Sequence, residues 1–220
     1  MKNKLVFFFL LFLFASRVFA GAYEDMEEAF IRNDTAAAIE LINRGMDINT
    51  VDKQGNTLLT QSIQRDMPDL FNFLIQKKAR LNVRNRNGET ALSIAAYLGR
   101  TDYAKRLIDA GAEINFFGWS PIIYAAYNGH TAIVDYLIQK GADVNAKAEN
   151  GSTALFFASR FGHIDTVKTL LTHHADPTIA NEREETAVDW AVKGKNTDIE
   201  DLLRAAGGRF GKSVTIEVAK

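Results

Sequence analysis

Residues 120–145 read SPIIYAAYNGHTAIVDYLIQKGADVN, and the rest of the chain is built on the pattern of this stretch. It opens with a segment rich in small residues, passes through a turn at Gly129, and continues as an aliphatic segment that ends at Gly141. The apolar residues of both segments have helical spacing, and a glycine after the second can adopt the left-handed conformation that ends a helix. The stretch therefore predicts two short helices joined by a tight turn and followed by a polar loop.

This pattern recurs along the chain with a nearly constant period. The motif that closes each unit begins at Gly45, Lys78, Gly111, Gly141 and His174. These starting positions are 33, 33, 30 and 33 residues apart. The motif that opens each unit begins at Thr57, Thr90, Ser120, Thr153 and Thr186 and keeps the same register. Two motifs that agree in spacing indicate an internal repeat.

The 33-residue period, with Thr-Pro-Leu-His-like, Gly-His and Gly-Ala-Asp-Val-Asn elements, resembles the ankyrin repeat. The resemblance implies an all-α solenoid of about six helix-turn-helix units with projecting turns. The expected repeats span approximately residues 22–51, 52–84, 85–117, 118–147, 148–180 and 181–207, within a domain of residues 21–207 that precedes a tail of residues 208–220. Such a stack should be elongated and curved, with a concave face suited to binding a protein.

Three residues depart from the family pattern. Lys78 and His174 stand where the family has a glycine after a helix, and Glu184 stands where the other loops have glycine. A side chain in left-handed backbone is strained, so we expect these positions to lower local stability without changing the fold.

The first 20 residues differ in character from the repeats. Lys2 and Lys4 precede 11 consecutive apolar residues, and Val18-Phe19-Ala20 suits a cleavage site. We therefore expect residues 1–20 to be a signal peptide cleaved after Ala20. An uncleaved membrane anchor is the alternative, but a span needs about 20 apolar residues.

Composition narrows the partner classes. The leader contains three basic residues and no acidic ones, so the expected mature chain has 23 basic and 27 acidic residues. It therefore lacks the excess of positive charge that is typical of nucleic-acid-binding proteins. The absence of cysteine excludes disulfides and thiolate metal sites, and it suits an oxidising compartment. The leader looks bacterial, so we expect a periplasmic protein whose mature chain does not insert into a membrane. No cofactor or metal is expected.

The candidate binding residues lie at positions that vary between repeats of this chain. The unit with the 30-residue interval lacks three polar turn residues and carries aromatic residues in the turn instead. Aromatic residues and arginine dominate the energetics of protein interfaces. The predicted partner-binding residues are Tyr97, Leu98, Phe116, Phe117, Trp119, Tyr127, Asn128, Arg160 and Phe161.

Two alternatives concern packing. In the first, the short turn folds inward, and Phe116 or Phe117 fills the space of the missing residues. In the second, aromatic residues pack between repeats; we expect this of Tyr124, Phe157 and Trp190, which share the register position of Ile94.

Chemical motifs are few. Residues 206–213 read AGGRFGKS and loosely match a phosphate-binding loop, but a helix precedes this segment and a strand-like pattern follows, which reverses the usual context. His130 and His163 occupy equivalent repeat positions and lack the spacing of metal ligands on one helix face.

These observations lead to one main functional hypothesis. We expect a non-enzymatic module that binds one folded periplasmic protein through its concave face and inhibits or protects an envelope enzyme. A scaffold or stabiliser of a periplasmic stress or redox enzyme is the alternative, and nucleotide binding through residues 206–213 is a more distant one.

Overall fold

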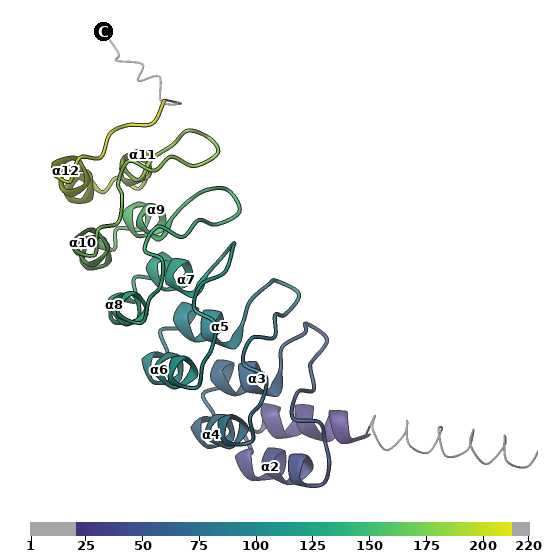
Figure 1. Cartoon of the computed structure of the whole chain (residues 1–220). Helices are drawn as coiled ribbons and strands as arrows, with labels where there is room; N and C mark the ends of the chain where they lie inside the picture. The colour runs from purple at the N-terminus through teal and green to yellow at the C-terminus, as the bar shows by residue number, and fades with distance from the viewer. Residues whose placement is uncertain (1–20, 213–220) are drawn as a thin grey trace, which may run out of the picture. The chain divides into compact units, whose positions relative to one another are not determined.

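The computed structural model describes residues 21–212, and the regular elements in this range are helices. The chain divides into two compact units after Arg80. The smaller unit contains a first helix over residues 21–31, followed by α2 (Thr35–Asn43), α3 (Leu58–Gln64) and α4 (Pro68–Gln76) (Figure 1). None of the helices in this range is long and apolar enough to span a bilayer. The predicted signal peptide and residues 213–220 of the tail lie outside the described residues.

The larger unit consists of helix pairs in two layers. Its helices are α5 (Ala91–Tyr97), α6 (Thr101–Asp109), α7 (Pro121–Tyr127), α8 (Thr131–Gln139), α9 (Ala154–Arg160), α10 (Ile164–Thr172), α11 (Ala187–Lys193) and α12 (Thr197–Ala205). Figure 1 shows α5, α7, α9 and α11 in an inner layer from which the loops project, and α6, α8, α10 and α12 in an outer layer. The predicted all-α architecture of helix-turn-helix repeats is confirmed.

Small side chains allow the inner helices to pack closely. Ala96 of α5, Ala126 of α7 and Ala158 of α9 are fully buried, at 0% exposure. In the outer layer, Leu107 and Leu137 are buried to the same degree. Each buried leucine side chain contributes about 1.5–3 kcal/mol, so the core is a row of contacts between neighbouring repeats.

A ladder of asparagine side chains joins consecutive loops. In each rung, the asparagine that closes one repeat accepts a hydrogen bond from a backbone N–H in the closing motif of the next. The rungs are Arg80 to Asn49 at 2.8 Å, and Glu113 to Asn82, Asp143 to Asn115 and Asp176 to Asn145 at 2.9 Å each. These loops lack the backbone pairing of a sheet, so the asparagines both satisfy loop amides and fix the register of each repeat on its neighbour.

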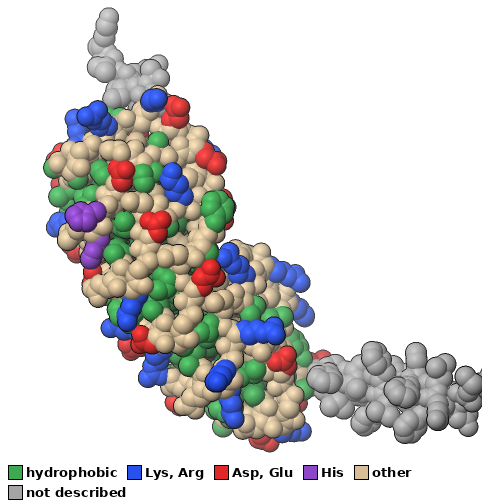
Figure 2. All heavy atoms as spheres, viewed as in Figure 1, with side chains coloured by type: hydrophobic (Ala, Val, Ile, Leu, Met, Phe, Trp, Pro, Cys, Tyr) green, Lys and Arg blue, Asp and Glu red, His purple; other side chains and the backbone are tan. Residues whose placement is uncertain are grey.

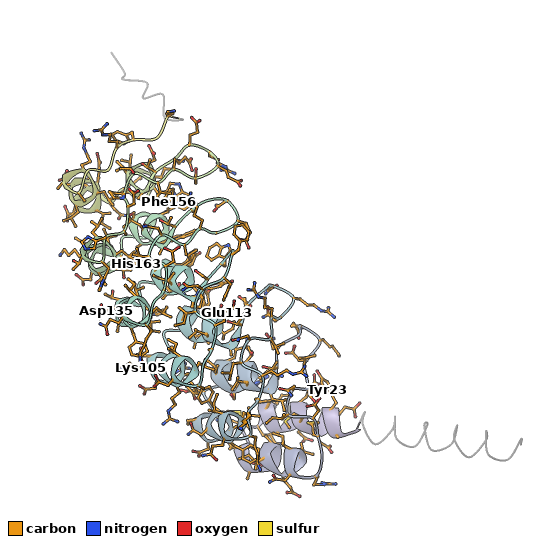
Figure 3. All side chains as sticks on the ribbon, viewed as in Figure 1. Tyr23, Lys105, Glu113, Asp135, Phe156 and His163 are labelled. Atoms are coloured by element: carbon orange, nitrogen blue, oxygen red, sulfur yellow. The ribbon has the colours of Figure 1, made fainter. Side chains whose placement is uncertain are left out.

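The turns inside the repeats carry a second link. His130 Nε2 lies 3.0 Å from the carbonyl oxygen of Tyr97, and His163 Nε2 lies 3.0 Å from that of Tyr127. Figure 3 shows His163 where α9 turns into α10. The glycine at each such turn makes room for the ring, because a Cβ on Gly99 would lie only 2.6 Å from His130. These histidines therefore have a structural role between repeats.

The three residues that depart from the family pattern have the left-handed backbone conformation expected of them. Lys78, His174 and Glu184 have φ values of 60°, 62° and 56°, in the left-handed region that favours glycine. A residue with a side chain is strained there by roughly 1–2 kcal/mol, and the helices nevertheless end at the expected places.

Thr186 and Asp189 anchor the start of the tail to the last repeat. Asp189 Oδ2 accepts hydrogen bonds from the Thr186 N–H at 2.7 Å and from the Gly211 N–H at 2.8 Å. The Thr186 hydroxyl donates to the carbonyl of Arg209 at 2.6 Å. Residues 209–211 are therefore held against α11.

Glu185 is a buried carboxylate at the base of the last loop. Trp190 Nε1 donates to it at 2.9 Å and Asn181 Nδ2 at 3.1 Å, and Lys193 forms an ion pair with it. Burial alone would raise the pKa of Glu185, but hydrogen bonds from Lys193, Trp190 and Asn181 outweigh it and lower the pKa from 4.5 to about 2. The charged form is thus strongly favoured by the fold.

We expect Glu185 to make the stability of the last repeat sensitive to acid. Its folded pKa is below its unfolded pKa, so its contribution is complete above about pH 4.5 and is lost as the pH falls towards 2. The contribution is on the order of 2 kcal/mol, because the half-exposed Lys193 weakens an ideal buried pair. Urea unfolding followed by circular dichroism at pH 6 and pH 3 should show a smaller pH dependence for Glu185→Gln than for the wild type.

Glu182→Gln is the matched control, because Glu182 is exposed in the same loop. It should retain the pH dependence of the wild type. Equal pH dependence in both variants would contradict the assignment to Glu185.

Candidate functional site

The candidate site is the inner face of the larger unit, which we define as the inner-layer helices and the loops that precede them. These loops are residues 83–90, 115–120, 147–153 and 180–186. Figure 2 shows hydrophobic side chains emerging between charged ones on the surface in view. All nine predicted partner-binding residues belong to these elements or to the residue immediately after an inner helix.

Four of the predicted residues are exposed and apolar. The exposed fractions are 77% for Phe117, 46% for Phe161, 41% for Tyr97 and 39% for Leu98. Among the described residues only seven large hydrophobic side chains are exposed, so these four are more than half of them. Exposed apolar side chains gathered on one face are typical of an interaction surface.

Trp119 and Tyr127 are less exposed than the sequence suggested. Both are half-buried, and the Trp119 ring packs against those of Tyr124, Tyr127 and Phe157 with centroids 5.2, 5.9 and 4.7 Å apart. Tyr127 continues the contact to Phe161 at 4.6 Å. Trp119 and Tyr127 are therefore only partly accessible to a partner, because aromatic residues of adjacent repeats meet and bury one another.

Phe116 and Phe117, which share the short loop, lie differently. Phe117 is exposed, whereas Phe116 is half-buried with the Arg84 guanidinium 4.1 Å from its ring centroid. The inward packing considered for both residues is therefore partly present at Phe116 and absent at Phe117.

Asn128 and Arg160 both make contacts between repeats. Asn128 Nδ2 donates to the carbonyl of Tyr97 at 2.7 Å, so its amide is already used in joining two repeats. Arg160 is half-buried, with its guanidinium 5.6 Å from the ring of Trp190. Both predicted binding residues therefore also take part in contacts between repeats.

The three aromatic residues expected in the core are buried to different degrees. All three pack against aromatic rings of neighbouring repeats, as expected, but Phe157 is buried whereas Tyr124 and Trp190 are only half-buried. The Tyr124 hydroxyl donates to Glu89 at 3.4 Å. Burial and the nearby Glu89 carboxylate raise the pKa of Tyr124, so its hydroxyl stays protonated and polar at neutral pH.

The short loop differs from its neighbours in how it is held. In two of the longer loops an asparagine side chain organises the turn. Asn85 Oδ1 accepts from the N–H groups of Asn87 and Glu89 at 2.9 and 3.0 Å, and Asn181 Oδ1 accepts from those of Arg183 and Glu185 at 2.9 and 3.0 Å. The short loop has no equivalent side chain and turns at buried Gly118, whose φ is 97°. Trp119 occupies the register position of Glu89, so an aromatic residue replaces a polar one at the base of this loop.

Sequence reasoning missed the cations beside the aromatic residues. Arg84 and Arg86 are exposed in the first loop of the face, and Arg84 stacks on Phe116. The available signal was the pair of arginines in a loop that precedes an aromatic loop. The stacking itself depends on how adjacent repeats align, which the sequence of one loop does not reveal.

The glycine-rich segment considered for phosphate binding uses its amides within the protein. The N–H groups of Gly207, Gly208 and Gly211 donate to Arg204, Leu203 and Asp189, respectively. A phosphate-binding loop needs such groups directed at its ligand. In the described residues no group of three or more histidine or acidic side chains is arranged to hold a metal ion.

Comparison with known proteins agrees with the repeat architecture. A family model described as Ankyrin repeats (3 copies) matches residues 26–117, 64–148, 115–181 and 147–212, which together cover most of the chain.

Similar curated proteins come from animals and bacteria. The chain is 30% identical over 149 residues to human neurogenic locus notch homolog protein 1, covering 66% of this chain and 6% of that protein. It is 33% identical over 179 residues to a putative ankyrin repeat protein of Rickettsia bellii, covering 74% of this chain and 51% of the relative. It is 29% identical over 177 residues to the mouse B-cell lymphoma 3 protein homolog, covering 77% and 39%. The chain thus spans at most about half the length of these relatives.

The chain belongs to the ankyrin repeat family, as the family match, the repeated helix pairs and the asparagine ladder show. The repeats of this family form protein interaction modules.

Proposed function

We propose that this chain is an exported, non-enzymatic module that binds one folded protein through the inner face of its larger unit. Its partner is a protein of the bacterial envelope, and binding inhibits or protects an enzyme there. The observation that carries the proposal is the exposure of Phe117, Phe161, Tyr97 and Leu98 on the same face.

Energetics support this choice of face. Burying an exposed aromatic side chain in an interface contributes strongly to affinity at a small cost in side-chain entropy. Around the exposed rings, half-buried Trp119 and Tyr127 are held in place by their neighbours. A surface that is already ordered loses less entropy on binding than a flexible one, so the aromatic packing preorganises it.

The proposal of export rests on the leader. Lys2 and Lys4, the apolar stretch of residues 5–15 and the Val18-Phe19-Ala20 ending form the pattern of a signal peptide.

We expect export to leave a chain that begins at Gly21. Expression of the full-length gene in a Gram-negative host, osmotic shock and N-terminal sequencing would identify the start of the released protein. A released protein starting at Gly21 supports periplasmic location. Retention of Met1 in the membrane fraction would contradict it.

Inhibition and scaffolding differ in what they do to the partner. Covering the mouth of an active site lowers the activity of an enzyme, whereas a stabilising scaffold raises its resistance to unfolding and leaves its activity intact. An assay of the captured enzyme with and without the chain distinguishes the two.

We expect binding to depend on the exposed phenylalanines. A pull-down from the periplasm of the native host with the wild-type chain should enrich a specific protein, and Phe117→Ala with Phe161→Ala should weaken that binding by at least about 2 kcal/mol, roughly thirtyfold. Both side chains are exposed, so the double variant should keep the circular dichroism spectrum of the wild type. Titration with the purified partner gives the affinity.

Ile31→Ala is the matched control, because Ile31 is 75% exposed and belongs to the smaller unit. It should bind as the wild type does. If the double variant and the wild type bind the partner with equal affinity, the inner face is not the binding surface.

A further inference from the structure

The aromatic part of the inner face, between residues 84 and 161, has a charge balance opposite to that of the chain. The rest of the face, α11 and its loop, carries four acidic residues, Glu182, Glu184, Glu185 and Asp189, and two basic ones, Arg183 and Lys193. The formal net charge of the chain is −1, with 27 acidic and 26 basic residues. On the loops and inner helices between residues 84 and 161, however, four basic residues accompany two acidic ones. The basic residues are Arg84, Arg86, Lys147 and Arg160, and the acidic residues are Glu89 and Glu149. The aromatic part of the face is therefore locally positive.

These cations have no carboxylate partners within the described chain. Ion pairs do occur in the larger unit, between Lys140 and Asp109 and between Lys193 and Glu185 for example, but none involves Arg84, Arg86, Lys147 or Arg160. Arg84 instead lies over the ring of Phe116, and Arg160 over that of Trp190. Stacking holds a guanidinium by its flat face and leaves the N–H groups at its edge directed outward for a carboxylate.

Glu89 is committed to the fold of its own loop. It accepts hydrogen bonds from Asn85 Nδ2 at 2.8 Å and from the Tyr124 hydroxyl at 3.4 Å. Its oxygens are thus satisfied by neutral donors, and no ion pair joins it to Arg84 or Arg86. The arginines remain available to an external anion beside exposed apolar side chains.

We infer that the segment bound by the inner face is an acidic protein segment, in which aspartate or glutamate residues alternate with aromatic or aliphatic ones. This inference rests on the proposed function and specifies the chemistry of its partner. Phe117, Phe161 and Tyr97 take up the apolar side chains, and Arg84, Arg86 and Arg160 pair with the carboxylates. Arginine forms two parallel hydrogen bonds with a carboxylate, which fixes the orientation of the bound segment as well as its charge.

Random 12-residue peptides displayed on phage test this inference without knowledge of the natural partner. Panning against the chain recovered from the periplasm should enrich peptides with net negative charge and at least one large apolar residue. Binding of these peptides should be lost in the Phe117→Ala, Phe161→Ala variant, which locates them on the inner face. Neutral or basic peptides, peptides that still bind this variant, or no bound peptides would each overturn the inference.

A matched set of variants then tests the arginines. One enriched peptide and its amide counterpart, with Asp and Glu changed to Asn and Gln, are titrated by fluorescence anisotropy. We expect the wild type to bind the acidic peptide at least tenfold more tightly, and Arg84→Gln with Arg86→Gln and Arg160→Gln to lose this preference. The control removes three cations of the outer layer, through Lys105→Gln, Lys140→Gln and Lys168→Gln, and should keep it. Equal loss in both triple variants would indicate net charge rather than the inner face and would overturn the assignment.

The two proposals fail in different ways. If the pull-down enriches a partner through Phe117 and Phe161 but the peptides show no acidic preference, the binding function stands and the partner chemistry is wrong. If the pull-down does not depend on these phenylalanines, the inner face itself is wrong.

Discussion

The hydrogen bond from each loop to an asparagine of the preceding loop is the constraint on which the repeat architecture depends. Two helices of seven and nine residues are too short to be stable alone, so each repeat relies on its neighbours. Buried alanines set how close the inner helices come, and the asparagine rungs such as Asp143 to Asn115 set the register of the loops. Stability therefore resides in positions that repeat along the chain.

Because stability depends on the positions that repeat, the positions that do not repeat are free to vary between units. Tyr97 and Phe117 are not required by the helix pairs, and the loop of Phe117 is three residues shorter than its neighbours without any change in the helices that flank it. In the short loop Trp119 stands at the register position of Glu89, where it joins an aromatic row that reaches Phe161. The same alignment of repeats places arginines over aromatic rings. The repeated residues thus stabilise the fold, and the residues that differ between repeats determine the chemistry of the binding surface.

The sequence predicted the fold well because the period, the glycines and the alanines are local signals that occur several times. Even the strained backbone at Lys78, His174 and Glu184 followed from register alone. The surface was harder to predict. Asn128, predicted only as a partner-binding residue, also donates to a backbone carbonyl 31 residues away. The burial of Trp119 likewise depends on Phe157 of the following repeat, and such contacts are visible only once the repeats are stacked.

Hydrogen–deuterium exchange with and without the captured partner would show whether the inner face is the binding surface, because it reports on every segment of the chain under the same conditions. We expect binding to slow exchange in the short loop, residues 115–120, and at the ends of α5, α7 and α9, while the outer helices α6, α8 and α10 exchange as in the free chain. Protection confined to the outer helices or to the smaller unit would contradict it.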